Sequence, residues 1–276
     1  MKIAIHQMCS GTDPLINAKT MVHVVAAATA DGANMFFAPE MSIMVDRDRR
    51  QSQTKIRTEQ ETAALGLLCA AAAKHSIWIH LGSIPVRSEV GGQRFANRTI
   101  VIDDKGNIRA RYDKIHLFDV ALASGESWRE SAVYDAGKEP VIVETPLGPL
   151  GLTICYDLRF PDLFSALAKS GVNAIAVPAA FTVPTGKAHW HTLLRARAIE
   201  AQAFVIAAAQ SGEHEDGRST YGHSLVIDPW GEVILDMGEG EGLGFAELDL
   251  DRIAEVRAQV PVEQNRRDIS APVRIP

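Results

Sequence analysis

The sequence has few cysteines and no long apolar run. Only three cysteines occur among 276 residues, at the widely spaced positions 9, 69 and 155. An odd number at such spacings fits neither a disulfide framework nor a paired-cysteine metal site, and it leaves at least one free thiol. No segment reaches the eighteen or so apolar residues of a membrane span, and the start of the chain lacks a signal-peptide pattern. We therefore expect a cytoplasmic protein that does not associate with a membrane.

An excess of positive charge is also absent. The net charge is −6, and the 28 basic residues are scattered along the chain. Binding to a phosphate backbone requires a clustered basic surface, so nucleic acid is not an expected partner. The apolar fraction of 46% and charged fraction of 22% are typical of a globular protein rather than a disordered one. No linker or repeat divides the sequence, and we expect one domain over residues 1–276 with an irregular tail over residues 260–276.

The apolar segments predict an α/β fold. They are short and rich in β-branched residues, with Ala-rich stretches of helical spacing between several of them. Because the helices are too few for two separate sheets, we expect a four-layer α-β-β-α sandwich of two mixed sheets with helices on the outer faces. Turn sequences at residues 103–107, 145–148 and 228–231 predict hairpins. The predicted strands are Lys2–Gln7, Asn34–Ala38, Ile77–Ser83, Asn97–Ile102, Ile108–Tyr112, Val141–Glu144, Gly151–Cys155, Ala174–Pro178, Ala203–Ala208, Gly222–Ile227, Val233–Asp236 and Gly244–Leu248, and the predicted helices are Pro14–Ala30, Thr58–His75, Pro161–Ser170, Ala188–Ala201 and Leu250–Ala258.

Cys155 lies at a predicted strand-to-helix turn. The predicted strand ends at this cysteine, and Pro161 is typical of the first turn of a helix. Such a turn exposes a side chain at the carboxyl edge of a sheet, near backbone N–H groups that favour a thiolate and a developing oxyanion. The turn alone fits a nucleophile and a buried structural cysteine equally. Cys9 and Cys69 have no such setting, and we expect packing roles for both.

Two charged residues also follow predicted strands. Glu40 ends an apolar strand, where a carboxylate can take a proton from a thiol and return it to a leaving amine. Lys114 follows another strand, where its ammonium can stabilise a thiolate and an oxyanion. Either one alone also fits an exposed surface charge. With Cys155 they make three reactive side chains at strand ends.

The segments around these residues resemble the signature segments of the nitrilase superfamily of carbon–nitrogen hydrolases. The resemblance is carried by Phe-Ala-Pro-Glu ending at Glu40, Tyr-Asp-Lys-Ile-His-Leu-Phe-Asp around Lys114, and Ile-Cys-Tyr-Asp-Leu-Arg-Phe-Pro-Asp-Leu around Cys155. It continues through residues 178–190 and 193–200, and so covers nearly the whole chain. Three ordered motifs of this length are a specific signal.

The resemblance implies a role for each of the three residues and adds a fourth. By it, Cys155 is the nucleophile, Glu40 the general base and Lys114 the charge stabiliser. Glu130 matches a second family glutamate that positions the lysine and the substrate, although a surface charge in a long loop is the alternative. Two carboxylates around one ammonium also make physical sense, because they keep the lysine protonated and held in place.

The implied reaction is hydrolysis of a small carboxylate-bearing amide, with release of ammonia through a cysteine thioester and with no metal or organic cofactor. The backbone N–H of Tyr156 and the ammonium of Lys114 would hold the oxyanion. Arg159 is the first candidate for binding the substrate carboxylate, although it can instead brace the turn. Phe181 and Thr182 complete the expected substrate-binding residues.

Within the superfamily, residues 116–119 and 179–190 resemble the branch that contains deaminated glutathione amidase and ω-amidase. Two departures leave the substrate open. Residues 120–125 lack the acidic residue and Pro-Gly turn usual there, and His191 replaces a glutamate, which would alter the charge near the pocket. A nitrilase, an N-carbamoyl amidase and an aliphatic amidase remain alternatives, and the family implies a homodimer or higher homo-oligomer.

Interpretations from other classes have less support. Nine histidines raise the possibility of a metal-binding module, but His189 and His191 diverge at a spacing of two on a helix, and no HExxH or CxxC motif accompanies them. A different cysteine or serine hydrolase is disfavoured because there is no GxSxG elbow. A catalytically silent protein of the same fold stays open. Arg195 and Arg197 are weaker ligand candidates, since Arg197 can pair with Glu200.

Overall fold

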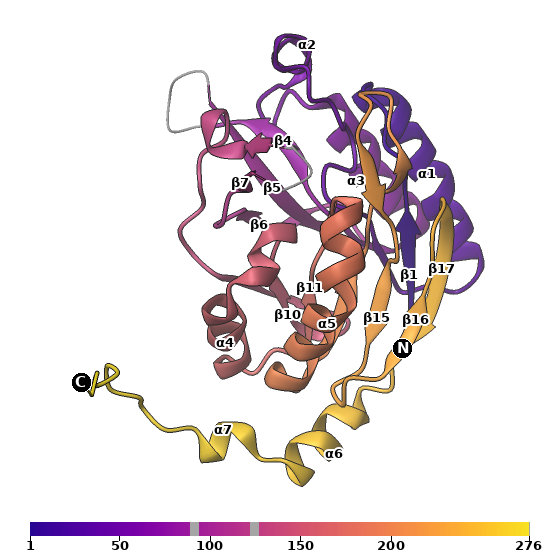
Figure 1. Cartoon of the computed structure of the whole chain (residues 1–276). Helices are drawn as coiled ribbons and strands as arrows, with labels where there is room; N and C mark the ends of the chain where they lie inside the picture. The colour runs from indigo at the N-terminus through magenta and orange to yellow at the C-terminus, as the bar shows by residue number, and fades with distance from the viewer. Residues whose placement is uncertain (89–93, 122–126, 276) are drawn as a thin grey trace.

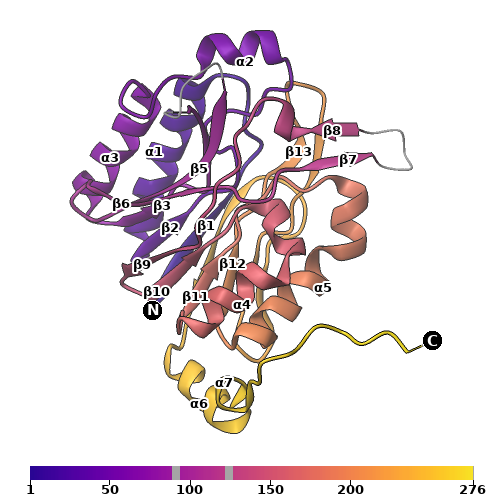
Figure 2. The same cartoon turned by 90° about the vertical axis from the view of Figure 1, so that its left-hand side faces the viewer.

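Two mixed β-sheets pack face to face, and each has helices on its outer face (Figures 1 and 2). This computed structural model describes residues 1–88, 94–121 and 127–275. The first sheet has the strand order β17-β1-β2-β3-β5-β4, with β6 paired to β5. Its strands are β1 (Lys2–Gln7), β2 (Met35–Phe37), β3 (Trp78–His80), β4 (Ile84–Arg87), β5 (Phe95–Ile102), β6 (Ile108–Asp113) and β17 (Gly242–Glu247).

The second sheet has the order β16-β15-β12-β11-β10-β9. Its three central strands run parallel, as do β1, β2 and β3 of the first sheet, and the remaining neighbours in both sheets are antiparallel. The carboxyl ends of parallel strands meet at one edge, where sites form in α/β proteins. The strands are β9 (Val141–Thr145), β10 (Gly148–Leu152), β11 (Ala174–Ala176), β12 (Phe204–Ala207), β15 (Leu225–Ile227) and β16 (Val233–Asp236).

The helices pair on opposite sides of this double sheet. α1 (Pro14–Ala30) and α3 (Ala63–His75) cover the first sheet, and α4 (Pro161–Lys169) and α5 (Val183–Ala201) cover the second. Side-chain alternation along β1 shows how one strand serves two layers: Ile3 and Ile5 belong to the core between the sheets, and Ala4 belongs to the core under α1 and α3. The four-layer sandwich predicted from the sequence is therefore confirmed.

Short elements complete the described structure. Two small hairpins lie outside the main sheets: β7 pairs with β8, and β13 pairs with β14. The elements are β7 (Asp119–Ala121), β8 (Ser127–Arg129), β13 (Ser211–Glu213), β14 (Ser219–Tyr221), α2 (Arg49–Lys55), α6 (Asp251–Gln259), α7 (Val262–Asn265) and two 3₁₀ helices over Glu130–Ala132 and Cys155–Arg159.

All twelve predicted strands have counterparts, and the three predicted hairpins are present as β5–β6, β9–β10 and β15–β16. Some boundaries were wrong. β10 ends at Leu152 rather than Cys155. α3 begins at Ala63 rather than Thr58, because residues 58–61 form a separate turn. α5 begins five residues before the predicted Ala188, with a proline in its first turn.

The C-terminal segment leaves the body of the protein after α7 (Figures 1 and 2). Ile269, Val273 and Ile275 are each more than four-fifths exposed. The expected irregular tail therefore contains one short helix and an extended stretch. That residues 1–276 form a single domain stays a prediction. No helix in the described ranges combines the length and apolar character that a membrane span requires.

Gly82 allows the segments after β2 and β3 to approach closely, and this generates the first prediction. Its φ is +68°, and an added Cβ would lie 1.9 Å from the carbonyl oxygen of Pro39, next to Glu40. Gly82→Ala should lower the free energy of unfolding by about 3 kcal/mol or more, from backbone strain and steric conflict. Urea unfolding measures this. The matched control Gly66→Ala, in α3 with open space around it, should be stabilised by about 0.5–1 kcal/mol. Equal stability of both variants would contradict this account.

Candidate active site

Glu40 lies just beyond β2 and is almost fully buried. The strand continues as an extended segment in which the Ala38 N–H donates to the carbonyl of His80. The Glu40 carboxylate accepts a hydrogen bond from the backbone N–H of Ala180 at 2.9 Å, which lies beyond β11 of the other sheet. Its backbone carbonyl accepts one from the Gln210 side chain at 3.0 Å. Glu40 is thus fixed by groups from both sheets.

Lys114 follows β6 and extends its ammonium between two carboxylates. Its Nζ donates to Glu40 Oε1 and to Glu130 Oε2, each at 2.9 Å. Only 2% of the lysine side chain is exposed. The backbone N–H of Lys114 donates to the carbonyl of Asn97 on β5, which fixes where the side chain starts. A buried ammonium requires such compensation, because removal from water disfavours the charged form.

Glu130 opens the first 3₁₀ helix and is held from three directions. Besides Lys114, the backbone N–H of Phe118 donates to its carboxylate at 2.7 Å. The Asn97 side-chain amide donates to Glu130 Oε1 at 3.1 Å and to Glu40 Oε1 at 3.0 Å. Asn97 therefore links the two carboxylates that flank the ammonium. Asn97 was not predicted as a site residue, because β5 also carries the polar Arg98 and Thr99, and a further amide in this strand gave no distinct signal.

Cys155 is the first residue of the second 3₁₀ helix and has a φ of +48°. A non-glycine residue in this left-handed region marks a strained turn. The backbone N–H of Cys155 donates to the carbonyl of Pro178, so the chain still follows β11 although β10 has ended. The side chain is buried beside Glu40 and the backbone N–H of Ala180. The predicted strand-to-helix turn is thus present, with Pro161 opening α4.

Asp157 connects this turn to the segment that carries Lys114. Its fully buried carboxylate accepts hydrogen bonds from the Tyr112 hydroxyl at 2.7 Å and from the backbone N–H groups of Ile154 and His116 at 2.9 and 3.0 Å. The His116 ring nitrogen lies 2.7 Å from the same carboxylate. Asp157 was not predicted as a positioning residue, because two of its partners, Tyr112 and His116, lie more than 30 residues away in sequence.

The charges of the site depend on one another. Burial raises the pKa of the Cys155 thiol well above its usual value, and the neighbouring Glu40 charge raises it further, with only partial opposition from Lys114. Burial also tends to raise the pKa of Glu40, but Lys114 and hydrogen bonds from Cys155 and Asn97 outweigh it and hold that pKa below its ordinary value. For Lys114, burial is outweighed by Glu130 and Glu40, and its pKa is raised. The resting site therefore contains a neutral thiol, an ionised Glu40 and a charged ammonium.

These groups face a cavity of about 540 Å³. Glu40, Lys114, Glu130 and Cys155 line it, and all four predicted substrate-binding residues line it as well: Tyr156, Arg159, Phe181 and Thr182. The Arg159 guanidinium lies over the rings of Tyr156 and Phe181, with distances of 5.9 and 5.7 Å to the ring centroids. The volume of the cavity is within the range of small-molecule sites.

The two weaker arginine candidates lie elsewhere. Arg195 donates to the Gly231 carbonyl at 2.9 Å, and Arg197 pairs with Glu200 at 2.8 Å and with the Leu158 carbonyl. His191 is not among the described residues that line the cavity, and its imidazole lies 3.0 Å from the carboxylate of Asp236. That it changes the charge near the pocket stays a prediction. Most of the divergent stretch 120–125 lies outside the described residues.

Basic side chains outnumber acidic ones around the cavity, which was not predicted from the sequence. We call its five arginines, Arg47, Arg49, Arg129, Arg159 and Arg218, the basic mouth. Among the residues that the structure describes, six basic and three acidic side chains line the cavity, whereas the whole chain has a net charge of −6. Scattered arginines gave no local signal, because they come from four separate segments. The four that were not predicted are Arg47, Arg49, Arg129 and Arg218.

Chemically, this arrangement can support nucleophilic attack on a carbonyl. A carboxylate next to the Cys155 thiol can take its proton, and the Lys114 ammonium can stabilise negative charge that develops on oxygen. The basic mouth favours an anionic ligand by charge complementarity. Among the described residues, no cluster of metal-ligating side chains is found in this cavity.

Comparison with known proteins places this structure among hydrolases. The profile of the carbon–nitrogen hydrolase family matches residues 2–258. Deaminated glutathione amidase from Rattus norvegicus is 40% identical over 270 residues, which are 96% of this chain and 82% of that protein. The Caenorhabditis elegans fusion protein NitFhit is 38% identical, and this chain covers 60% of its length.

Two solved structures extend the similarity to three dimensions. The NitFhit crystal structure superposes with a TM-score of 0.89 at 37% identity, over 96% of this chain and 65% of that chain. A mutant amidase from Nesterenkonia sp. AN1, in which acrylamide has added to the active-site cysteine, superposes with a TM-score of 0.79 at 26% identity, over 95% of this chain and 98% of that one.

The buried ion group generates the second prediction. Lys114→Met leaves two buried carboxylates without their counter-charge and should lower the free energy of unfolding at pH 7 by about 3–5 kcal/mol. Urea unfolding at pH 7 and pH 5 measures this. The control Lys138→Met removes an exposed lysine and should change stability by less than about 0.5 kcal/mol.

The loss should be smaller at pH 5. In the wild-type protein the lowered pKa of Glu40 contributes stability above its unfolded pKa, and this is lost only as the pH falls through the folded pKa. The raised pKa of Lys114 contributes stability that is fully present below its unfolded pKa, and therefore at both pH values. Without the lysine, burial raises the pKa of Glu40. Protonation of Glu40 near pH 5 then removes one buried negative charge, which makes the loss of unfolding free energy in Lys114→Met smaller. A deficit that grows toward pH 5 would contradict this assignment.

Proposed function

This chain belongs to the carbon–nitrogen hydrolase family, and we propose that it hydrolyses the amide of a small carboxylate-bearing molecule through a thioester on Cys155. One observation carries the proposal: Cys155, Glu40, Lys114 and Glu130 converge on one cavity from four separate segments of the chain. The family supplies the reaction class, and the geometry supports these residues as its machinery.

In the proposed reaction, the Cys155 sulfur adds to the amide carbon while Glu40 takes the thiol proton. The addition of the sulfur and the proton transfer to Glu40 are coupled, because the resting thiol is neutral and its raised pKa disfavours a free thiolate. The oxyanion is stabilised by the Lys114 ammonium and the backbone N–H of Tyr156. Glu40 then returns the proton to the nitrogen, and the C–N bond breaks to release the amine, which is ammonia from α-ketoglutaramate and the cysteinylglycine dipeptide from deaminated glutathione.

The second half of the reaction regenerates the enzyme. Glu40 accepts a proton from water as the water attacks the thioester carbon, and it returns this proton to the sulfur as the C–S bond breaks, which gives the acid product, the neutral thiol and an ionised Glu40. Glu130 and Asn97 act as positioning residues, since they hold the lysine and the general base. No step requires a metal or an organic cofactor.

The basic mouth supports an anionic substrate. Arg159 and the four further arginines at the mouth outnumber the acidic residues there, and an arginine can bind a carboxylate with two parallel hydrogen bonds. The relatives named deaminated glutathione amidase direct the choice among anionic amides. Deaminated glutathione is therefore our proposed substrate, with α-ketoglutaramate, the substrate of ω-amidase, as the smaller representative of the same class.

Two broader features belong to the proposal. Three free cysteines and no disulfide support a reducing location such as the cytoplasm. Exposed apolar residues on α5 and in the C-terminal segment, including Ile199 and Ile269, support a homo-oligomer.

Replacement of the proposed nucleophile generates the third prediction. Cys155→Ala should reduce ammonia release from α-ketoglutaramate by roughly 10⁴-fold or more, because Cys155 is the only thiol among the described residues that line the cavity. A coupled ammonia assay measures this. Cys69→Ala, a thiol on α3 away from the cavity, should keep the wild-type rate. Substantial ammonia release by Cys155→Ala would refute the assignment.

Charge selection by the mouth generates the fourth prediction. Arg159→Met keeps the apolar stem and removes the charge, so kcat/KM for a carboxylate-bearing amide should fall roughly 10- to 100-fold. A neutral amide of the same length should change less than about threefold. Arg195→Met, whose guanidinium lies outside the cavity, should change neither. Equal losses on both substrates would show that Arg159 braces the turn instead.

A further inference from the structure

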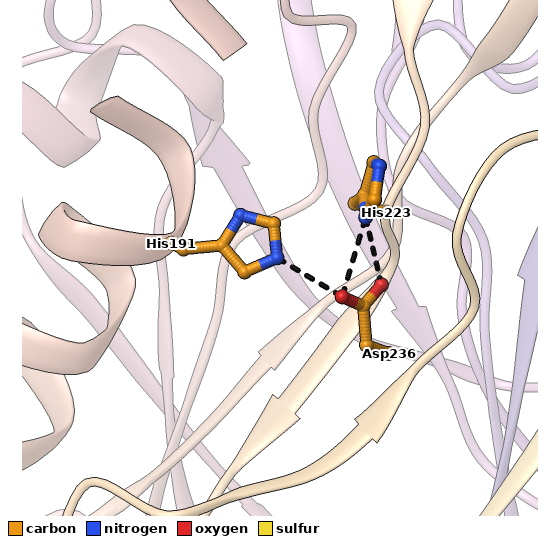
Figure 3. Close-up of side chains that lie close together, drawn as sticks. All are labelled: His191, His223 and Asp236. Carbon is orange, nitrogen blue, oxygen red and sulfur yellow. Dashed lines mark hydrogen bonds and ion pairs between the residues drawn. The ribbon is translucent and has the colours of Figure 1, made fainter. Parts of the chain in front are cut away.

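A second group of titratable side chains lies outside the cavity (Figure 3). His191 from α5, His223 from the segment between β14 and β15, and Asp236 at the end of β16 point toward one another. The Nε2 of His191 lies 3.0 Å from Asp236 Oδ2. The Nδ1 of His223 lies 2.9 and 3.2 Å from the two oxygens of the same carboxylate. The proposed hydrolysis uses none of the three.

His223 is held rigidly in this group. Its φ is +53°, in the left-handed region that non-glycine residues rarely adopt. Its backbone N–H donates to the Gly238 carbonyl at 2.7 Å, and its own carbonyl accepts a hydrogen bond from the indole of the buried Trp190 at 2.8 Å. The Tyr221 ring stacks on the imidazole with ring centroids 4.5 Å apart. The ring is therefore positioned before any ligand arrives.

Asp236 is oriented as well. The backbone N–H of Gly238 donates to its Oδ1 at 2.9 Å, which leaves the carboxylate facing both imidazoles. The three side chains come from α5, from the segment between β14 and β15 and from β16, so the group bridges α5, which covers the second sheet, and β16 at the edge of that sheet. About a third or less of each side chain is exposed, which leaves access for an ion and for water.

We infer that His191, His223 and Asp236 form a binding site for one divalent zinc ion. Zinc bound tetrahedrally at about 2.0–2.2 Å has ligand atoms roughly 3.3 Å apart. The two imidazole-to-carboxylate distances are already near this value, and all three ligand atoms lie within 4.8 Å of one another. The third distance, between the two imidazole nitrogens, is at most 4.8 Å and would have to shorten toward the same value on binding. Water fills the fourth position.

The donor set determines the class of metal. Two imidazoles and one carboxylate favour zinc and its first-row neighbours, whereas magnesium and calcium require mostly oxygen ligands. In the metal-free protein the carboxylate accepts the imidazole N–H groups. For the metal to bind at a facing nitrogen, a neutral imidazole must first move its single proton to the other ring nitrogen, by exchange with water.

Bound zinc would join α5 to β16 and stabilise the fold. α5 begins directly after Phe181 and Thr182, which line the cavity, and Tyr221 follows Thr220, another lining residue. The ion would thus support the elements behind one wall of the cavity without reaching the reacting atoms. Its role is structural, and its presence can be tested without any activity assay.

Zinc titration of purified protein tests the site. Thiols also bind zinc, and the Cys9 sulfur lies 3.7 Å from the His214 ring. The titrations therefore use a Cys9→Ser/Cys155→Ser protein and compare the variants within it. Isothermal titration calorimetry should show one zinc per chain that His191→Gln and Asp236→Asn each weaken by at least about 100-fold. His23→Gln, which removes an exposed histidine on α1, should leave the affinity unchanged. Zinc should raise the Tm of the His23→Gln control, but it should not raise the Tm of His191→Gln or of Asp236→Asn.

Cobalt provides an independent readout. Co²⁺ in a nitrogen and oxygen site should give visible absorption bands without the intense charge-transfer band of a thiolate ligand, and His191→Gln should abolish them. Three results would overturn the inference: no zinc binding by the control protein, unchanged binding in both site variants, or a thiolate band that shows binding at a cysteine. Because the readouts are affinity, Tm and spectrum, a failure of the proposed amidase activity would leave them unaffected.

Discussion

The ion group formed by Lys114, Glu40 and Glu130 is the interaction on which the rest of the site depends. An ammonium that is 2% exposed stays charged only if carboxylates compensate for the lost water. Those carboxylates lie beyond β2 and at the start of a 3₁₀ helix, and Asn97 of β5 links them. The fold must therefore bring three distant segments together before any chemistry is available. Gly82 contributes by letting the chain pass within contact distance of the segment that carries Glu40.

The same group explains how a buried cysteine can be both inert and reactive. Burial and the Glu40 charge keep the Cys155 thiol protonated at rest, and a protonated thiol is a poor target for oxidants. The carboxylate that raises the thiol pKa is also the group placed to accept its proton. In the proposed mechanism, reaction therefore begins only when an amide carbon is present to share the developing charge with Lys114. The basic mouth then selects which amides reach that position.

The layers of the fold, and the strands that the site residues follow, could be predicted from the sequence better than the partners of individual side chains. Alternating or continuous apolar patterns determine which face of a strand such as β1 is buried, so the four-layer sandwich followed from pattern alone. The family resemblance identified four residues that the structure brings into one cavity, while their catalytic roles stay predictions. Asn97, Asp157 and the four further arginines of the cavity were not predicted, because most of the residues that they meet lie far away in sequence. The partner of His191 could not be predicted either, since Asp236 is 45 residues further along the chain.

The central claim is that catalysis passes through a thioester on Cys155. Rapid acid quenching during a single turnover of α-ketoglutaramate, followed by mass spectrometry of the intact protein and its peptides, tests it most directly. The account predicts a transient adduct on the Cys155 peptide with the mass of the substrate less ammonia, which decays as the acid product forms. Product formation without any adduct on this peptide, or with an adduct on another residue, would contradict the account.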